Sequence, residues 1–192
     1  MYTDLLLKEM EYLSKIPVDR ISGFVQTIEG YAKNHTRIIT SGMGKAGQIA
    51  HTFSTTLSST GTPSYFLHPA EAQHGDLGLI GEDDILIIFS NSGKTREVLE
   101  LIDLSRNLNP ELKILSIVGE SNEELDTKTN FVLKFGPVEE ICPLGLTPTT
   151  STTCMSVICD LIVVGLMRIK DFTKNEYSKR HHGGYLGKKS KD

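Results

Sequence analysis

The sequence lacks the features of several large classes of protein. It has no tryptophan, and only three of its 192 residues are cysteine. Cys142, Cys154 and Cys159 are odd in number and show neither metal-like nor CxxC spacing, so a disulfide framework is not expected. Free thiols in a reducing cytoplasm are the simpler interpretation.

The chain also lacks an excess of basic charge and a long uncharged apolar run. Its formal net charge is -4, whereas a nucleic-acid-binding domain normally has a basic face. Residues 1–13 show no basic segment followed by an apolar one, so no signal peptide is expected. The longest apolar stretch, residues 157–167, contains Asp160 and is too short to span a bilayer. We therefore expect a cytoplasmic protein with neither a nucleic-acid nor a membrane partner.

The elements that the sequence does contain are those of one globular α/β domain. Apolar spacing predicts helices over residues 3–15, 18–34, 45–59, 96–108, 122–129, 149–169 and 173–180. Short apolar runs predict strands over residues 37–40, 63–67, 84–90, 113–118 and 131–135. This alternation predicts a doubly wound, five-stranded parallel sheet flanked by helices. Residues 1–192 would form a single domain, with N-terminal helices over 1–34 and a polar tail over 188–192.

The segment FSNSGKTREVLE, residues 89–100, contains a Gly-Lys-Thr triplet like that of a nucleotide-binding P-loop. A P-loop needs a glycine five residues before the glycine of this triplet, so that the backbone can wrap the phosphates. Here that position is Ile88, inside the predicted strand 84–90. The long phosphate-wrapping loop is missing, and a nucleoside triphosphate is not the expected ligand.

The segment GMGKAG, residues 42–47, matches the GxGxxG pattern of dinucleotide-binding proteins. That pattern also needs an acidic residue at the end of the next strand, about twenty residues on, to bind the ribose. The next strand lies in TPSYFLHP, which has no carboxylate, so NAD is not expected. The glycines themselves predict a tight turn with close packing.

A single phosphate group suits these two turns better. Hydroxyl and backbone N–H groups gather at the start of a predicted helix, where the helix dipole favours negative charge. The residues concerned are Ser90, Asn91, Ser92 and Thr95 and, in the turn after the first strand, Ser41 and Gly42. Ordinary N-capping by Ser90 or Ser92 is the alternative, but so many donors at a ligand-facing turn favour a phosphomonoester.

Five segments resemble, in order and spacing, the sugar isomerase (SIS) domain of D-arabinose 5-phosphate isomerases. They are SGMGKAGQIA, TLSSTGTPSYFLHPAEAQHGDLG, IIFSNSGKTREV, EEICPLGLTPTTSTT and RHHGGYLGKK. The resemblance spans about residues 37–189, and the length of these segments makes it specific. It implies a five-stranded parallel sheet between helices, in agreement with the elements above. It also implies a form without the two CBS domains that many relatives carry after the last segment.

The resemblance implies conversion of D-ribulose 5-phosphate to D-arabinose 5-phosphate, the first step toward Kdo (3-deoxy-D-manno-octulosonate) for bacterial lipopolysaccharide. Such an aldose–ketose isomerase moves a proton between neighbouring carbons through an enediol. It needs a base, a hydrogen-bond donor to the carbonyl oxygen and a binding site for the distant phosphate group. The expected ligand is a small sugar phosphate, and no cofactor is implied.

Carried over residue by residue, the resemblance gives catalytic roles to Lys45, Glu97, Glu140, His74 and His181. Lys45 would stabilise the enediolate oxygen, and its unfavourable place at a helix start argues for a function. Glu140 or His181 would transfer the proton, and we expect the pKa of Glu140 to be raised toward neutrality. His74 or His181 could also open the sugar ring. Glu97 could equally be an ordinary residue of a first helical turn.

The histidines leave zinc as an alternative, because three imidazoles and a carboxylate could form a catalytic zinc site. His74 lies far from His181 and His182 in the sequence, and the resemblance implies metal-independent isomerisation, so no required metal is expected. The resemblance also implies a homo-oligomer, a dimer or tetramer with sites at subunit boundaries. In such an assembly His74 or His181 would serve the pocket of a neighbouring chain.

Three positions depart from the family pattern. Lys94 stands where many relatives have glutamate, Arg96 adds a second cation, and His182 replaces a usual proline. The two cations either strengthen phosphate attraction or are solvated surface charges, and His182 puts the rigidity of its turn in doubt. Two other functions stay open: an isomerase of the same fold that acts on a hexulose or heptose phosphate, and a sugar-phosphate sensor without catalysis.

Overall fold

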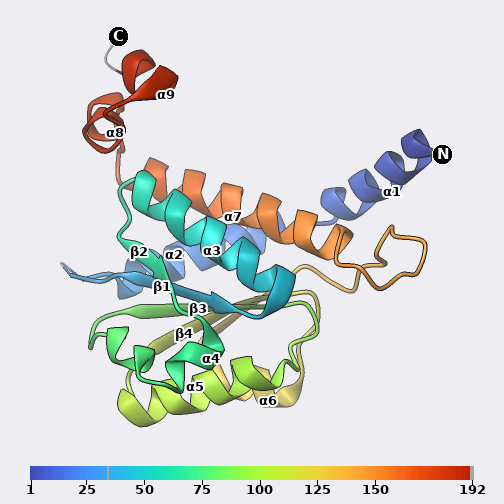
Figure 1. Cartoon of the computed structure of the whole chain (residues 1–192), viewed down its shortest axis with the longest axis horizontal. Helices are drawn as coiled ribbons and strands as arrows, with labels where there is room; N and C mark the ends of the chain where they lie inside the picture. The colour runs from blue at the N-terminus through green and yellow to red at the C-terminus, as the bar shows by residue number, and fades with distance from the viewer. Residues whose placement is uncertain (34, 191–192) are drawn as a thin grey trace.

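The computed structural model describes residues 1–33 and 35–190, in which a parallel sheet lies between two layers of helices (Figure 1). This architecture confirms the predicted α/β fold. Asn34, Lys191 and Asp192 lie outside the described residues. They include the last position of the predicted helix 18–34 and the end of the predicted polar tail.

The sheet has the strand order β2-β1-β3-β4-β5, and all neighbouring strands are parallel. Its strands are β1 (Ile38–Gly42), β2 (Ser64–Phe66), β3 (Ile85–Ser90), β4 (Lys113–Val118) and β5 (Phe131–Lys134). The chain runs from β1 outward to β2 and then crosses back to β3. Ligands of such sheets bind beyond the carboxyl ends of the strands at this reversal, here between β1 and β3.

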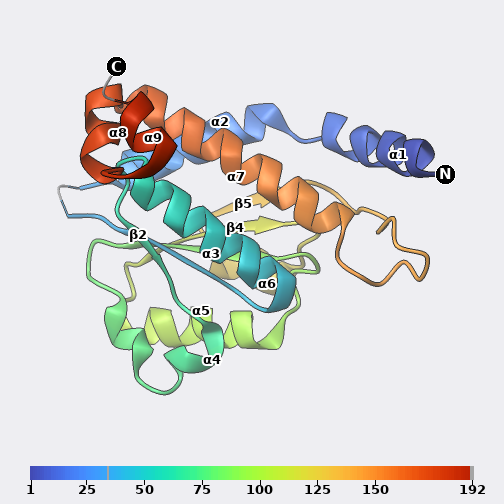
Figure 2. The ribbon, with the colours of Figure 1, turned by 45° about the horizontal axis from the view of Figure 1, so that its top comes forward.

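Helices cover both faces of the sheet (Figures 1 and 2). One face carries α2 (Val18–Tyr31), α3 (Gly44–Ser59) and α7 (Thr150–Ile169), and the other carries α4 (Pro69–Ala72), η1 (Asp76–Leu79), α5 (Arg96–Leu108) and α6 (Glu123–Lys128). Helix α1 (Tyr2–Ser14) packs on the start of α7 and projects beyond the sheet. Helices α8 (Lys174–Arg180) and α9 (Gly184–Lys189) follow the opposite end of α7.

The central strands are apolar on both faces because each lies between two helix layers. In β3, Ile85, Ile87 and Phe89 belong to the core shared with α2, α3 and α7. Leu86 and Ile88 belong to the core shared with α5. Successive side chains of a strand point to opposite faces, so the continuous apolar run that predicted this strand is what its position requires.

Most predicted elements agree with the structure to within three residues, and α5 and β4 have the predicted bounds. Three short elements were not predicted: α4, η1 and α9. Helix α4 has only four residues, too few for a periodic apolar pattern. It is fixed instead by His68, whose side chain accepts a hydrogen bond from the N–H of Ala70, and by Pro69 at its first position. Helix α9 includes the first two residues of the predicted polar tail.

Helix α7 is long and apolar enough to cross a membrane by length and composition, with a mean hydropathy of 1.8. One such helix is weak grounds for a membrane location, because the core helix of a globular protein meets the same criteria. Met155, Ile158 and Ile162 are fully buried in the core shared with α2 and α3. The fold thus uses α7 as a core helix.

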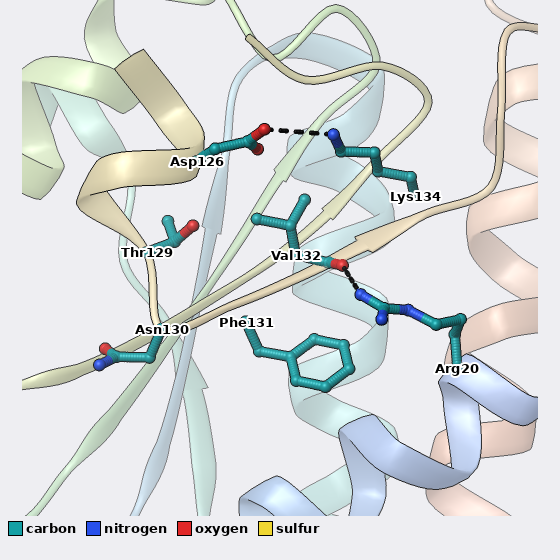
Figure 3. Close-up of a pocket in the computed structure, with 7 residues that line it drawn as sticks. All are labelled: Arg20, Asp126, Thr129, Asn130, Phe131, Val132 and Lys134. Atoms are coloured by element: carbon teal, nitrogen blue, oxygen red, sulfur yellow. Dashed lines mark hydrogen bonds and ion pairs between the residues drawn. The ribbon is translucent and has the colours of Figure 1, made fainter. Parts of the chain in front are cut away.

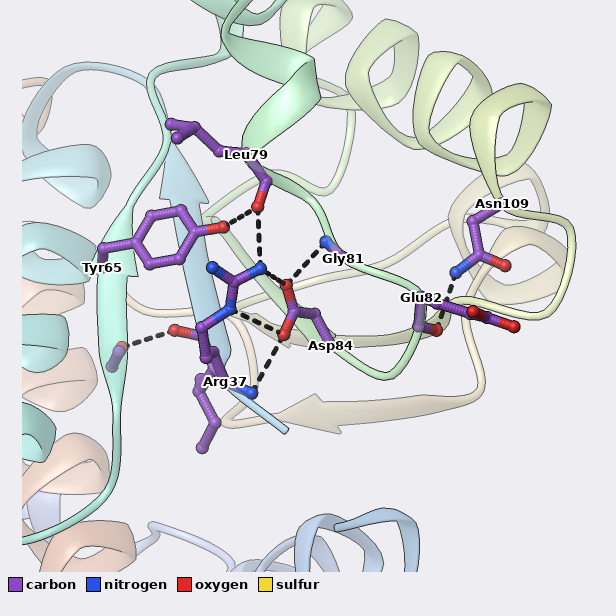
Figure 4. A network of polar contacts seen from close by, with 9 residues as sticks. Arg37, Tyr65, Leu79, Gly81, Glu82, Asp84 and Asn109 are labelled. Atoms are coloured by element: carbon purple, nitrogen blue, oxygen red, sulfur yellow. Dashed lines mark hydrogen bonds and ion pairs between the residues drawn. The ribbon is translucent and has the colours of Figure 1, made fainter. Parts of the chain in front are cut away.

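A polar network ties the start of β1 to the loop before β3 (Figure 4). Asp84 is 3% exposed and accepts hydrogen bonds from the N–H of Gly81 at 2.7 Å and from the backbone and guanidinium of Arg37 at 3.0 and 2.6 Å. Arg37 also donates to the carbonyl of Leu79, which accepts from the hydroxyl of Tyr65. Burial raises the pKa of Tyr65 to about 12, so this hydroxyl remains a donor.

Replacing Asp84 with alanine should destabilise the fold by about 3 kcal/mol, because it leaves a guanidinium and two backbone N–H groups without their acceptor. The loss should be measured by urea denaturation of Asp84→Ala and wild type. Asp83→Ala is the matched control, since among the described residues Asp83 makes a single surface ion pair, with Lys33. Equal losses in the two variants would contradict a specific role for the Asp84 network.

Candidate active site

A cavity of about 220 Å³ lies where the strand order reverses. The turn after β1, the turn after β3 and the first turn of α7 form its walls. It is lined by Met43, Lys45, Ala46, Phe89, Ser90, Asn91, Ser92, Thr95, Pro148, Ser151, Thr152 and Met155. An apolar floor with a few convergent polar groups is typical of a site for a small polar ligand.

The turn after β3 is held in shape by its own hydroxyls. The hydroxyl oxygens of Ser90 and Thr95 lie 2.9 Å apart, and Ser90 also accepts from the N–H of Gly93 at 3.1 Å. Gly93 has a φ of +66°, and a Cβ there would lie 2.6 Å from a backbone oxygen, so only glycine fits. Ser90 is 2% exposed and holds the turn, whereas Ser92 is exposed on the cavity wall.

Helix α5 begins beside this turn without a side-chain cap. Its N-cap residue is Thr95, whose side chain makes no capping hydrogen bond. Ser90 and Ser92 accept instead from N–H groups inside the turn, those of Gly93 and Lys94. Because the first N–H groups of a helix have no partner within it, this uncapped terminus suits an anion.

Two glycines bring the start of α3 against the end of β1. A Cβ on Gly47 would lie only 2.3 Å from the carbonyl oxygen of Gly42. This contact places Lys45, in the first turn of α3, on the cavity wall, where its Nζ donates to Gln48 at 3.3 Å. A cation at a helix amino terminus opposes the helix dipole, so an anionic ligand explains Lys45 better than stability does.

Two predicted phosphate-binding residues do not line this cavity. Ser41 is fully buried in β1 and donates to the carbonyl of Leu67 at 2.5 Å, which ties β1 to the end of β2. Gly42 lines a separate space of about 640 Å³ on the other side of the turn, together with His51 and His68. Both residues therefore shape the turn rather than face the cavity.

Glu140 binds the first turn of α7. Its Oε2 atom accepts from the N–H of Thr149 at 2.6 Å, from the Thr149 hydroxyl at 3.0 Å and from the N–H of Ser151 at 3.3 Å. Burial raises the pKa of Glu140, but the nearby hydroxyl of Ser151 and the hydrogen bonds from Thr149 and from the N–H of Ser151 outweigh burial and lower the pKa below its usual value of 4.5. The predicted rise toward neutrality is therefore wrong, because these bonds stabilise the ionised form. Glu140 is a carboxylate at neutral pH, joined to the cavity wall through Ser151.

Like Glu140, the other three predicted catalytic residues are not among those that line the cavity. Glu97 is half-buried in the first turn of α5, next to the turn after β3. His74 is exposed in the loop after α4. His181 stacks on Tyr177 at the end of α8, with ring centroids 3.7 Å apart. Helix α7 spans 20 residues, or about 30 Å, and separates α8 from the cavity at its other end (Figure 1).

The wall that α7 provides was not predicted from the sequence. Pro148, Ser151 and Thr152 line the cavity, and they lie in CPLGLTPTTSTT, a segment that carried the family resemblance but received no role. A signal was present, because a run of hydroxyl residues at the start of a predicted helix is the pattern that identified the turn at residues 90–95.

A larger cavity, about 530 Å³, runs along the edge strand β5 (Figure 3). The charged side chains that line this cavity already have partners within the protein. Arg20 lies 4.8 Å from the centre of the Phe131 ring and donates to the carbonyl of Val132 at 2.9 Å, and Lys134 pairs with Asp126 at 3.2 Å. It lies away from the strand reversal, so the smaller cavity is the better candidate despite its size.

Within residues 1–33 and 35–190, no group of three or more histidine, cysteine or acidic side chains could hold a metal ion. His74 and His181 belong to different segments, after α4 and after α8. The zinc site considered from the sequence is therefore not assembled by these residues of one chain.

The SIS domain model matches residues 31–165. The chain belongs to the SIS domain family. A Bacteroides fragilis protein described as a candidate phosphosugar isomerase involved in capsule formation has a similar crystal structure. It is 51% identical, with a TM-score of 0.91 over 96% of this chain and 97% of that one. An Escherichia coli protein in complex with arabinose 5-phosphate is 27% identical, with a TM-score of 0.85 over 94% and 95% of the two chains.

Two curated SIS relatives are named arabinose 5-phosphate isomerases. KpsF of Escherichia coli is 43% identical over 152 residues, which cover 79% of this chain and 47% of the relative. KdsD of Yersinia pestis is 39% identical over 183 residues, which cover 94% and 55%. The chain thus spans about half the length of the curated relatives it matches.

The contacts of Glu140 predict how it affects stability. Glu140→Gln should cost about 1 kcal/mol at neutral pH, because a carboxylate stabilises the amino terminus of α7. Folding lowers the pKa of Glu140 from 4.5. Its stabilisation is therefore fully present above pH 4.5 and is lost as the pH falls through the folded-state pKa.

Urea denaturation of wild type and Glu140→Gln at several pH values would check this. The stability difference should shrink below pH 4.5. Glu139→Gln is the control, since Glu139 is exposed and pairs only with Lys8. A difference for Glu140→Gln that stayed constant down to about pH 2 would contradict the lowered pKa.

Proposed function

We propose that this protein is an aldose–ketose isomerase that interconverts D-ribulose 5-phosphate and D-arabinose 5-phosphate. The observation that carries the proposal is the cavity at the strand reversal. There, an uncapped helix terminus suited to one phosphate shares a small space with Lys45 and with the α7 turn that Glu140 binds. The names of KpsF and KdsD, and the arabinose 5-phosphate bound to the Escherichia coli neighbour, support the same substrate class.

The phosphate lies against the turn at residues 90–95 in this proposal. Ser92, Thr95 and the first N–H groups of α5 bind its oxygens, and the helix dipole favours its charge. Holding the phosphate fixes one end of the five-carbon chain, so that the carbons at the other end are oriented for proton transfer.

Glu140 is the proposed base, because its lowered pKa keeps it ionised at neutral pH. It takes a proton from C1 of ribulose 5-phosphate and returns it to C2, while a hydroxyl proton passes from O1 to O2. The ammonium group of Lys45 stabilises the negative charge that develops on oxygen in the enediolate. His181 is the proposed carrier of the proton between the two oxygens.

His181 can take this role only in the pocket of a second copy, because α7 separates it from the cavity of its own chain. We therefore propose a homo-oligomer with shared sites. Two surfaces offer exposed apolar side chains for such contacts. They are Leu6, Leu7 and Met10 on α1, and Leu161, Val164 and Ile169 on α7. His74 and Glu97 are candidates for the same shared site.

We place the reaction in the cytoplasm, where it would supply D-arabinose 5-phosphate for Kdo and bacterial surface carbohydrate. The connection of the Bacteroides fragilis relative with capsule formation supports a role of this kind. The reducing environment also suits the three free cysteines.

Deuterium exchange tests the activity. In deuterated water, the protein should convert ribulose 5-phosphate to arabinose 5-phosphate with deuterium at C2, followed by NMR. Lys45→Ala and Glu140→Gln should lower kcat at least about 100-fold while the protein stays folded, and Glu139→Gln should keep it. Absence of exchange with any five-carbon ketose phosphate would overturn the proposal, and faster turnover of a six-carbon substrate would reassign it.

Mixing two inactive variants tests the shared site. Lys45→Ala and His181→Ala should each be inactive alone. If one chain supplies Lys45 and another His181, subunit exchange should restore roughly a quarter of wild-type activity in a dimer, because half of the dimers are mixed and each has one intact site. The same two variants mixed without subunit exchange are the control. No recovery from mixed oligomers would place both residues in one chain's site or remove His181 from it.

A further inference from the structure

Three buried serine hydroxyls have no hydrogen-bond partner among the residues that the structure describes: those of Ser105, Ser121 and Ser151. Leaving a buried hydroxyl without a partner costs about 1–3 kcal/mol, and each such group calls for an explanation. Of the three, Ser151 alone lines the candidate cavity. A group that the protein itself does not satisfy, on the wall of a ligand site, is available for the ligand.

The four hydroxyl residues around Ser151, in contrast, all have hydrogen-bond partners. In the first turn of α7, the hydroxyls of Thr149 and Thr150 donate to Glu140 and Glu9, at 3.0 and 2.8 Å. The hydroxyls of Thr152 and Thr153 donate to the carbonyl of Thr149, at 2.9 and 3.0 Å.

Ser151 itself is 1% exposed. Its hydroxyl is close enough to Glu140 to help lower the pKa of that carboxyl, yet no described atom meets it with hydrogen-bond geometry. Of the five hydroxyls at residues 149–153, that of Ser151 is the one without a hydrogen bond to a described atom, so it can turn from the Glu140 carboxylate toward a ligand oxygen.

Charge decides which part of the ligand Ser151 meets. Two carboxylates, Glu9 and Glu140, bind this turn of α7, so a dianionic phosphate is unfavourable beside it. The uncapped start of α5 and the ammonium of Lys45 lie on the other walls and favour the phosphate. The uncharged sugar end of the ligand is therefore the part that suits the α7 wall.

We propose that the hydroxyl of Ser151 donates a hydrogen bond to the oxygen at C1 or C2 of the sugar, opposite the phosphate-binding turn. The proposal rests on the isomerase function proposed above and adds a catalytic residue to it. The hydroxyl keeps its proton, and its bond strengthens as negative charge develops on the substrate oxygen. It acts beside Glu140, which removes the proton from carbon, and opposite Lys45.

The first experiment compares Ser151→Ala with Ser105→Ala. Both variants remove a fully buried hydroxyl that lacks a described partner, so both should keep the wild-type fold and melting temperature within a few degrees. Ser151→Ala should lower kcat by about 10- to 100-fold with little change in KM, because its bond is strongest in the transition state. Ser105→Ala, near the carboxyl end of α5 and outside the cavity lining, should keep wild-type kinetics.

The second experiment uses inorganic phosphate as an inhibitor. Its inhibition constant should be unchanged in Ser151→Ala and raised about 10-fold in Ser92→Ala. Weaker phosphate inhibition in Ser151→Ala with an unchanged kcat would overturn the assignment and make Ser151 part of the phosphate site. Wild-type kinetics in Ser151→Ala would overturn it as well.

A binding measurement separates this proposal from the isomerase function. Calorimetry should show that D-arabinitol 5-phosphate, which cannot isomerise, binds wild type more tightly than inorganic phosphate does. Ser151→Ala should reduce the ratio of these two affinities by about 5- to 10-fold. If wild type shows no isomerase activity but Ser151→Ala still reduces the affinity ratio, only the proposed reaction is overturned. If wild type is active but Ser151→Ala keeps both the affinity ratio and kcat, only the role of Ser151 is overturned.

Discussion

The contact between Gly42 and Gly47 is the constraint on which the site depends. With no side chain between them, α3 begins directly against the end of β1, and a Cβ on Gly47 would lie 2.3 Å from the carbonyl oxygen of Gly42. The approach brings Lys45 to the same small cavity as the turn after β3. A pattern that suggests dinucleotide binding in the sequence is therefore explained by packing, and its functional consequence is the position of one lysine.

The amino terminus of α7 is organised in the opposite way to that of α5. Glu140 and Glu9 satisfy the hydroxyl and N–H groups of α7 with negative charge, whereas the N-cap side chain of α5 makes no capping bond. Two helix termini that are chemically alike in isolation thus become different walls of one cavity. The difference gives the cavity a direction, with a wall that suits an anion on one side and a carboxylate on the other, as the proposed reaction at the far end of a phosphorylated chain would require.

The same organisation accounts for the state of Glu140. A base buried in an apolar pocket titrates near neutrality, but Glu140 accepts three hydrogen bonds and is ionised well below that range. Its basicity toward carbon then depends on what the substrate and the other walls contribute. A single chain brings the turn after β3 and Lys45 to one cavity, binds Glu140 to the α7 turn that forms another wall, and leaves His181 a helix length away. In the proposed reaction, His181 would therefore act from a neighbouring chain.

The sequence by itself determined the layers of the fold and the polar turn after β3. Alternating apolar runs and helical periods encode the sheet, because each strand and helix must bury its own apolar face, and that information is local. Ser90 to Thr95 were found for the same reason, since a strand, a turn and a helix start are contiguous. Tertiary structure alone decided that Ser41 faces Leu67 rather than the cavity, that Glu140 is ionised, and that Ser151 lines the same cavity as the turn after β3. These facts depend on residues that are not neighbours in the chain, 9 positions apart for Glu140 and Thr149 and 26 for Ser41 and Leu67, and their hydrogen bonds are set only when the sheet and its helices pack together.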